Sequence, residues 1–205
     1  MSRTVPVPNL TGVVLAGGAG SRCGGADKGF LQFNGRPLIE NMLMQLGPQV
    51  EKILISANRH HETYTRYGHP VVPDETPGFT GPMAGVCAGL NEARTEWVLC
   101  VPVDAVQLPQ DIAQRMCAAA HQQGASTVVA HDGVSMIPVV CLIRCDLCAD
   151  LRSEFAANRR SLRDWLKRKS AVELQFDNHP RAYWSVNTFD ELRSLNAIFK
   201  TPAAP

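Results

Sequence analysis

The residues best suited to chemistry lie near the N-terminus, where a short apolar run is followed by a glycine-rich loop. The run at residues 13–16 predicts a buried strand, and the loop after it holds five glycines together with Arg22 and Lys28. Glycine lets a ligand approach the backbone closely, and the free N–H groups of such a loop can surround an anion. Arg22 can bind a phosphate through two parallel hydrogen bonds, and Lys28 adds a compact positive charge. We therefore predict a binding site for a triphosphate.

Two other phosphate-binding motifs are excluded by their spacing. The P-loop requires Gly-Lys-Ser/Thr after four spacer residues, whereas Lys28 follows Asp27. The dinucleotide fingerprint G-x-G-x-x-G fails by one residue, because Cys23 stands where its third glycine is required. A nicotinamide-dependent dehydrogenase is therefore disfavoured. The remaining alternative is a glycine-rich turn with solvated charges.

Carboxylates stand at the ends of two further predicted strands, at residues 70–74 and 97–103. Asp74 closes the first strand and Asp104 follows the second. A triphosphate carries Mg²⁺, which proteins typically hold through one or two carboxylates together with the substrate phosphates. Asp104 is therefore our candidate metal ligand. The alternatives are an aspartate that begins a turn at position 104 and a solvated loop acid at position 74.

The elements that must position these residues alternate between strand and helix. Besides the strands above, the pattern predicts strands at residues 50–55 and 126–130 and helices at residues 38–46, 82–93 and 109–121. This alternation is typical of an α/β fold with a doubly wound, mainly parallel sheet in three layers. Ligands of such sheets bind beyond the carboxyl ends of the strands. The polar positions that fall at such ends are residues 16–28, 56–60, 74 and 104.

The C-terminal part is less regular. Pro138 interrupts a strand predicted at residues 134–143, so we expect a bulge or an edge there. The other elements predicted in this part are helices at 146–157 and 161–169, strands at 171–176 and 183–186, and a last helix that a capping box opens at Thr188. We predict a single domain over residues 1–205, with flexible tails at residues 1–9 and 201–205.

Composition limits the partners that the chain can have. The net charge of the 205 residues is +1, so no overall field attracts nucleic acid or an acidic membrane. No apolar run approaches the ~20 residues of a membrane span, and the N-terminus lacks the apolar stretch of a secretion signal. We expect a cytoplasmic monomer that binds neither nucleic acid nor membrane.

The seven cysteines include one spacing that could hold an iron–sulfur cluster. Cys141, Cys145 and Cys148 follow the pattern C-x3-C-x2-C of radical enzymes. Cys141 lies in a predicted strand, however, and Asp146 is predicted to begin a helix, which would place the three thiols on different elements. We therefore interpret them as buried or incidental thiols of a cytosolic chain.

The glycine loop resembles a known family. Its residues match the signature L-A-G-G-x(3)-R-x-G-G-x-D-K-G of nucleotidyltransferases with a glycosyltransferase-A-like, Rossmann-like fold. The double glycine before Asp-Lys is most similar to the MobA group, the molybdenum cofactor guanylyltransferases. The matching residues are Leu15, Ala16, Gly17, Gly18, Arg22, Gly24, Gly25, Asp27, Lys28 and Gly29.

The resemblance covers roughly residues 10–196 and implies an activity. It implies transfer of GMP from GTP to molybdopterin, with Mg²⁺ bound at Asp104 and with Arg22, Lys28 and Asp104 as catalytic residues. The implied nucleotide-binding residues are Leu15, Ala16, Gly17, Gly18, Lys28, Ser56, Asn58, Asp74 and Asp104. The implied acceptor-binding residues are Gly81, Pro82, Gly85, Arg159, Arg160 and Asn187. The implied protein partners are other cofactor-biosynthesis proteins and apo-molybdoenzymes.

Several positions depart from the family pattern and keep alternatives open. Ser56 stands where relatives often carry Asn, Val106 where they usually have Pro, and Ile137 where they tend to have His. The basic helix after Arg160 can also be read as a solvated face, and Asn187 as a loop residue beside a helix cap. The alternative functions are a related transferase that uses CTP, on molybdopterin or on a sugar or alcohol phosphate, and a nucleotide-binding partner without turnover.

Overall fold

The computed structural model describes residues 6–18, 25–75, 81–176 and 185–199. The first strand begins earlier than the sequence pattern indicated. Strand β1 spans Val7–Leu15, and Val7 pairs with Val50. The prediction of a flexible tail over residues 1–9 is therefore wrong for residues 7–9, because sheet pairing binds that stretch of backbone. The tail predicted at residues 201–205 lies outside the described residues.

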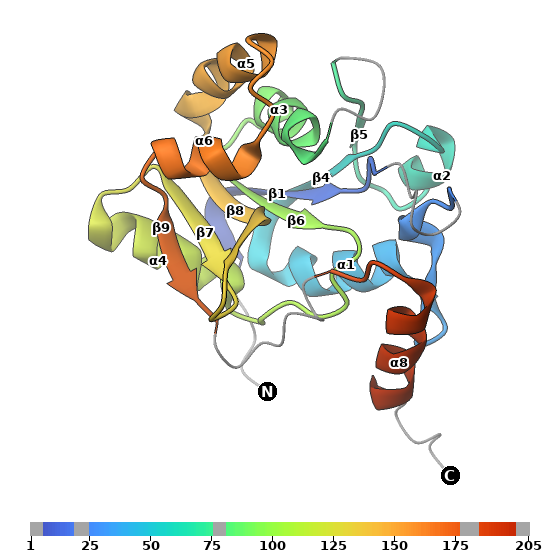
Figure 1. Cartoon of the computed structure of the whole chain (residues 1–205). Helices are drawn as coiled ribbons and strands as arrows, with labels where there is room; N and C mark the ends of the chain where they lie inside the picture. Colours follow the sequence, from blue (N-terminus) through green and yellow to red (C-terminus); the bar gives the residue numbers. More distant parts are fainter. Residues whose placement is uncertain (1–5, 19–24, 76–80, 177–184, 200–205) are drawn as a thin grey trace.

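Apart from a short antiparallel pair, β2 (Gln32–Phe33) and β3 (Arg36–Pro37), the strands form one twisted sheet that runs through the middle of the molecule (Figure 1). Within the described ranges the sheet has seven strands in the order β5-β4-β1-β6-β8-β7-β9. Every neighbouring pair is parallel except the two that contain β8, which runs antiparallel to β6 and β7. The doubly wound, mainly parallel α/β sheet is thus confirmed. The remaining strands are β4 (Val50–Ser56), β5 (Val71–Val72), β6 (Trp97–Pro102), β7 (Thr127–His131), β8 (Met136–Arg144) and β9 (Val172–Gln175).

The proline in β8 produces the expected bulge. Ala130 on β7 pairs with Ile137, while the preceding Val129 pairs with Cys141, so three residues of β8 are looped out between these pairs. Pro138 is the first of them, and a residue without an N–H group is tolerated there because it interrupts no ladder hydrogen bond. The expectation of an edge strand is wrong, since β8 lies between β6 and β7.

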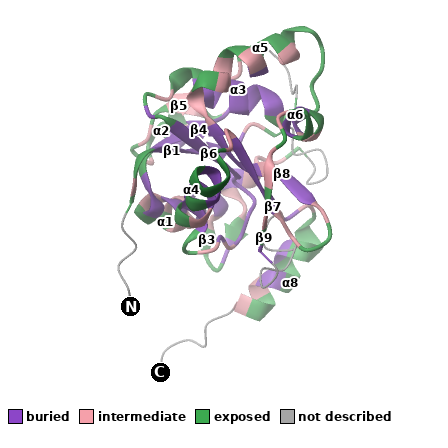
Figure 2. Ribbon diagram, turned by 90° about the vertical axis from the view of Figure 1, so that its left-hand side faces the viewer, coloured by how far each residue is buried: buried purple, intermediate pink, exposed green. Residues whose placement is uncertain are grey.

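Helices cover both faces of the sheet, so the fold has three layers (Figures 1 and 2). Helices α1 and α4 lie on one face, and α3, α5 and α6 lie on the other. Each face has its own buried apolar cluster, and β6, which is buried throughout, contributes to both. These helices span Leu38–Leu46 (α1), Pro82–Glu92 (α3), Ile112–Gln123 (α4), Cys148–Ala156 (α5) and Leu162–Arg168 (α6).

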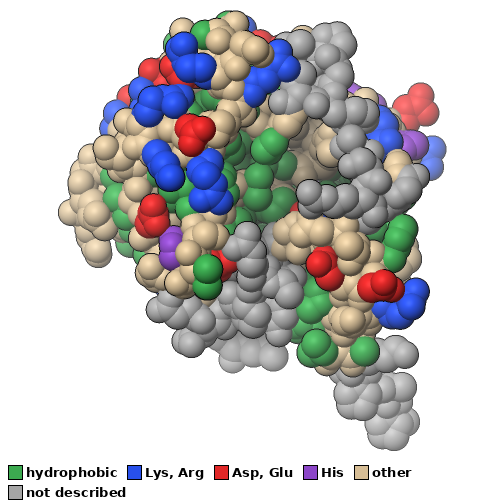
Figure 3. Space-filling model, viewed as in Figure 1, with side chains coloured by type: hydrophobic (Ala, Val, Ile, Leu, Met, Phe, Trp, Pro, Cys, Tyr) green, Lys and Arg blue, Asp and Glu red, His purple; other side chains and the backbone are tan. Residues whose placement is uncertain are grey.

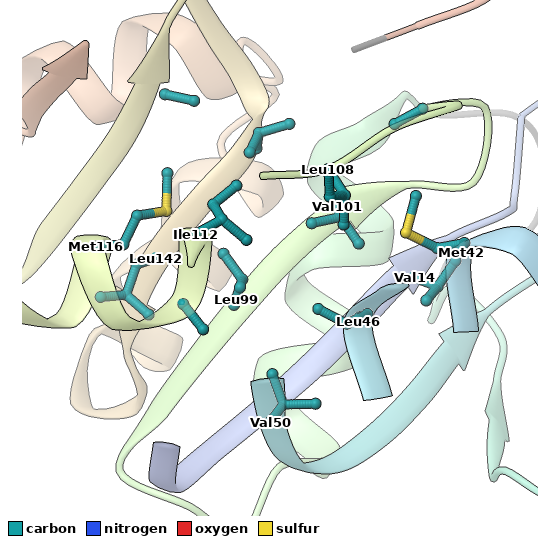
Figure 4. Close-up of a cluster of buried hydrophobic side chains, with 14 of the residues drawn as sticks. Val14, Met42, Leu46, Val50, Leu99, Val101, Leu108, Ile112, Met116 and Leu142 are labelled. Carbon is teal, nitrogen blue, oxygen red and sulfur yellow. The ribbon is translucent and has the colours of Figure 1, made fainter. Parts of the chain in front are cut away.

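The core beneath α1 and α4 is built as the apolar spacing predicts. Three neighbouring strands, β1, β6 and β8, direct side chains toward the helices, among them Val14, Leu99, Val101 and Leu142 (Figure 4). The helices present their apolar faces to these strands. The helical residues labelled in Figure 4 are Met42, Leu46, Ile112 and Met116, all fully buried. This cluster holds the central strands in register and therefore holds their carboxyl ends together.

Helix α3 packs unusually close to the sheet. A Cβ atom on Gly89 would lie 2.7 Å from a methyl carbon of Val13, and one on Gly85 would lie 2.6 Å from Oγ of Ser56. Real Cβ contacts are not this short, so these two positions require glycine. The close approach brings the start of α3 to the ends of β1 and β4.

The last helix, α8 (Phe189–Phe199), begins at the predicted capping box. The Oγ1 atom of Thr188 accepts a hydrogen bond from the Glu191 N–H, and Oε2 of Glu191 accepts from the Thr188 N–H. The strand predicted at residues 183–186 is wrong for Ser185 and Val186, which are irregular, and its first two residues lie outside the described ranges. In the described part of the chain, no helix has the length and apolar character needed to cross a bilayer.

Candidate active site

A cleft of about 650 Å³ opens at the carboxyl ends of β1, β4 and β6. This is the edge at which the sequence pattern placed the site. The residues that line the cleft are Leu15, Ala16, Gly17, Gly18, Lys28, Ser56, Asp74, Gly81, Pro82, Gly85, Pro102, Val103, Asp104, Val139, Ser185 and Asn187. Twelve residues of the predicted site are in this set. Asn58 adjoins the cleft through Asp74, whereas Arg22 lies outside the described residues.

One wall of the cleft carries an ion pair between the glycine loop and the end of β6. The Nζ atom of Lys28 donates to Oδ2 of Asp104 at 2.5 Å and to the carbonyl oxygen of Val186 at 2.8 Å. The Ser185 hydroxyl donates to the same Oδ2 atom at 3.3 Å. Both charged side chains are mostly buried, with 21% of Lys28 and 11% of Asp104 exposed. Each charge is therefore largely balanced by the other.

The carboxylate of Asp104 fits the requirements of a metal that arrives with a nucleotide. The described hydrogen bonds of the carboxylate both end at Oδ2, so within the described residues Oδ1 is the candidate oxygen ligand. No group of three or more acidic, histidine or cysteine side chains suited to a metal occurs in the described ranges. A cation here would take one carboxylate oxygen from the protein and the rest from substrate phosphates and water, as Mg²⁺ commonly does.

The cleft is also lined by a second carboxylate, which an asparagine holds. The Nδ2 atom of Asn58 donates to Oδ2 of Asp74 at 2.7 Å, and Oδ1 of Asn58 accepts from the Asp74 N–H at 2.9 Å. Burial raises the pKa of Asp74, and the hydrogen bond from Asn58 opposes this rise. Oδ1 of Asp74 and Oγ of Ser56 are buried without a hydrogen-bond partner in the described part of the chain. Both residues line the cleft, so these two atoms are candidates for contact with a ligand.

Arg59 links the two described ends of the glycine loop. Its guanidinium donates to the carbonyl oxygen of Gly18 at 3.2 Å and to that of Gly25 at 3.0 Å. The Arg59 guanidinium therefore holds Gly18, which lines the cleft, at a set distance from Gly25, in the turn that precedes Asp27. This role could not be assigned from sequence, because an arginine three residues after the end of a strand carries no distinguishing local pattern.

The start of α3 forms the floor of the cleft. Gly81 has φ +91°, a conformation that side chains rarely adopt, and Pro82 follows at the first helical position. Helix starts are generally suited to an anion, although here Pro82 has no N–H group and the Ala84 N–H donates to the Gly81 carbonyl oxygen at 3.3 Å. Across the cleft, the bulge of β8 contributes Val139. Val139 could not be assigned from sequence, because only the sheet order brings β8 beside β6.

Arg159 and Arg160 do not line the cleft. Arg159 forms a double hydrogen bond with Glu154, which also binds Arg168. Arg160 lies over the ring of Phe155, 5.2 Å from its centroid, and lines a separate cavity of about 530 Å³ between α3 and α5. In the space-filling view, basic side chains gather over α5 and α6, beside apolar surface at the centre (Figure 3).

The three closely spaced cysteines lie on different elements, as the sequence analysis predicted. Cys141 is on β8, Cys145 begins the 3₁₀ turn Cys145–Leu147 and Cys148 begins α5. The thiols of Cys145 and Cys148 have raised pKa values, with burial as the main cause. They are buried or half-buried thiols rather than thiolates ready to bind metal.

Comparison with known proteins now defines the family. The family model described as the MobA-like NTP transferase domain matches residues 12–173. The chain belongs to this family. A molybdenum cofactor guanylyltransferase from Ralstonia nicotianae is 39% identical over 200 residues, which cover 93% of this chain and 98% of that protein. A molybdenum cofactor guanylyltransferase from Burkholderia ambifaria is 41% identical over 199 residues, covering 93% and 97%.

Solved structures place the same fold in the MobA-like family. The crystal structure of molybdopterin-guanine dinucleotide biosynthesis protein A from Archaeoglobus fulgidus superimposes with a TM-score of 0.77 and covers 92% of this chain and 97% of that one. The two sequences are 19% identical. The glycosyltransferase-A-like sheet expected from the loop signature is thereby confirmed, and the nucleotidyltransferase class follows from the family match.

Proposed function

We propose that this MobA-like protein transfers GMP from GTP to molybdopterin and releases pyrophosphate. One observation carries the proposal: the cleft is lined by a cation–carboxylate pair and by a second carboxylate that has an oxygen without a partner in the described part of the chain. Lys28 and Asp104 form the pair, and Asp74 provides the oxygen. A nucleoside triphosphate has matching groups, with a base at one end and charged phosphates at the other.

Asp74 is our candidate for reading the guanine base. Guanine presents its ring N1–H and its amino group side by side, and both are donors. The free Oδ1 of Asp74 and the adjacent Oδ2 form a complementary pair of acceptors. Cytosine has no adjacent pair of donors on that edge, so a carboxylate in this position favours GTP over CTP. Ser56, whose Oγ atom also lacks a partner, adds a second polar contact near the base or ribose.

Lys28 and Asp104 are our candidates for the phosphate end. The ammonium group of Lys28 would neutralise charge on the triphosphate and on the leaving pyrophosphate. Asp104 would hold Mg²⁺, which would supply positive charge to balance that of the phosphates. Positioning and charge neutralisation dominate phosphoryl-type transfer. No general base is required, because a phosphate monoester acceptor is already ionised near pH 7.

The acceptor side is assigned to the start of α3 and the segment before α8. Gly81, Pro82, Gly85 and Asn187 line that part of the cleft. The positive end of the α3 dipole suits the terminal phosphate of molybdopterin. Arg160 lies in the neighbouring cavity and would assist only an acceptor that extends past α3.

The test is pyrophosphate release from purified protein with Mg²⁺ and molybdopterin, using GTP and CTP in parallel. We expect release with GTP that requires both Mg²⁺ and molybdopterin. Pyrophosphate release with CTP and not with GTP would mean that the protein is a transferase that uses CTP, and that Asp74 does not select guanine. Tight GTP binding without any release would favour a nucleotide-binding partner instead of an enzyme.

A further inference from the structure

The Asp27-Lys28-Gly29 motif is held by a tyrosine from another part of the chain. The hydroxyl of Tyr64 donates a hydrogen bond to Oδ1 of Asp27 at 2.7 Å, across 37 residues of sequence. The same Oδ1 atom accepts from the Gly29 N–H at 3.1 Å. One carboxylate oxygen therefore joins the tyrosine to the backbone on the far side of Lys28.

Gly29 leaves room for the tyrosine hydroxyl. A Cβ atom at this position would lie 2.1 Å from the Tyr64 oxygen and 3.0 Å from the ring carbon that carries it. Neither Gly29 nor Tyr64 can move independently, because both are buried. The aspartate and the glycine of the motif are thus both explained by contact with the same side chain.

The tyrosine is itself fixed in place. Tyr64 is fully buried in helix α2 (His61–Thr65) and stacks on Phe30, with ring centroids 4.8 Å apart and an interplanar angle of 28°. Burial is the main cause that raises the pKa of Tyr64, and the hydrogen bond to Asp27 adds to it. The hydroxyl is therefore protonated at neutral pH and acts as a donor.

Lys28 lies between the two points that this contact fixes. It begins the 3₁₀ turn Lys28–Phe30, and Asp27 caps that turn. Its side chain leaves the turn toward Oδ2 of Asp104 and the carbonyl oxygen of Val186. A change in the turn would move the base of the lysine side chain and thus its ammonium group.

We propose that Tyr64 is a positioning residue, whose hydroxyl acts through Asp27 to set the turn that directs Lys28 at the nucleotide phosphates. The proposal rests on the proposed function, because it takes Lys28 as a phosphate contact. Tyr64 itself touches no substrate, and its effect on nucleotide binding passes through the turn.

A double-mutant cycle on the full-length protein tests this coupling. The Kd for GTP with Mg²⁺ is measured by calorimetry for wild type, Tyr64→Phe, Lys28→Ala and the double variant, below the unfolding temperature of each. Tyr64→Phe keeps the stacked ring and removes only the hydroxyl, and we expect about a tenfold weaker Kd. In the Lys28→Ala background we expect the same change to weaken the Kd by less than about twofold.

Two further variants separate this coupling from general destabilisation. Tyr67→Phe removes a hydroxyl from the same segment without touching the Asp27 contacts, and its Kd should equal that of wild type. Asp27→Ala removes the shared acceptor and is measured in the same two backgrounds, so the test does not depend on the folding of one variant. Asp27→Ala should also weaken the Kd for GTP in the wild-type background and have little effect on it in the Lys28→Ala background.

The outcomes distinguish this proposal from the proposed function. An unchanged Kd for Tyr64→Phe, or an equal loss with and without Lys28, overturns the positioning role. If wild-type protein binds GTP but transfers nothing to molybdopterin, the proposed function is overturned. The double-mutant cycle on the Kd for GTP can then still be interpreted. Wild-type protein that does not bind GTP overturns both.

Discussion

The ammonium group of Lys28 lies 2.5 Å from a carboxylate oxygen of Asp104, although 76 residues separate the two in sequence. Lys28 comes from the turn after the glycine loop, and Asp104 comes from the end of β6. Each group neutralises the charge of the other. Under the proposed function, a triphosphate with its cation would offer a new partner to both, with the phosphates for Lys28 and the cation for Asp104.

Removing the Asp104 carboxylate should abolish turnover without unfolding the protein. Asp104→Ala deletes the candidate Mg²⁺ ligand, while Lys28 retains the Val186 carbonyl as a partner and is partly solvated. Pyrophosphate release measures activity, and circular dichroism with thermal unfolding measures folding. Activity near the wild-type value in a folded variant would remove the metal role from Asp104.

Removing the Lys28 ammonium should slow turnover at least about tenfold, because a buried charge contact to phosphate is lost. Lys52→Ala is the matched control, since Lys52 is an exposed lysine on β4. The quantities to compare are kcat and KM for GTP in both variants. Equal activity of the two variants would place the triphosphate elsewhere.

Asp74→Asn should weaken GTP binding about 10- to 100-fold, because an amide replaces one acceptor with a donor that faces the guanine donors. Binding of ATP and CTP should change little, since neither base has guanine's adjacent donors. Calorimetric titration with all three nucleotides measures the selectivity. A parallel loss for all three would mean that Asp74 maintains the shape of the cleft and does not read the base.

Gly85→Ala should destabilise the protein by about 1–3 kcal/mol, because overpacking forces neighbouring atoms apart. The added carbon would meet Oγ of Ser56 at 2.6 Å and a methyl carbon of Leu15 at 3.1 Å. Chemical denaturation measures the loss, and the additional change Ser56→Ala should recover part of it. Gly47→Ala is the control, since its Cβ would meet only a carbon of Ile53 at 3.8 Å. Similar losses for both glycines would contradict the close packing of α3.

Glu154 should stabilise the protein only above strongly acidic pH. Hydrogen bonding from Arg159, followed by the charges of Arg159 and Arg168, lowers the pKa of Glu154 from 4.5 to about 2. Because the folded pKa is the lower one, this stabilisation is complete above the unfolded value and is lost as the pH falls from 4.5 to about 2. Glu154→Gln should therefore be less stable than wild type at pH 7, and the gap should close in strong acid.

The free energy of unfolding at a series of pH values measures the Glu154 gap. Glu92→Gln serves as the control, because Glu92 is an exposed glutamate of α3 outside the ion pairs of the described chain. A gap between wild type and Glu154→Gln that stays constant with pH would mean that the variant loses packing and no charge interaction.

Local patterns determined much of the fold and one half of the site. The apolar run before the glycines, the helix pattern of α3 and the capping box at Thr188 depend on residues within a few positions of one another. The sequence alone therefore predicted the alternating elements and the carboxyl-end location of Lys28, Asp74 and Asp104. It also predicted the bulge at Pro138, since proline cannot donate a ladder hydrogen bond whichever residues surround it.

Only the tertiary structure decided which distant groups meet. The pairing of Tyr64 with Asp27, the place of Ser185 beside Asp104 and the separation of Arg160 from the cleft have no counterpart in local spacing. The antiparallel insertion of β8, which brings Val139 to the cleft, is also a property of the whole sheet. The physical reason is that a motif encodes residue types and short-range geometry. Contacts between distant residues instead depend on strand order and on how closely helices such as α3 pack against the sheet.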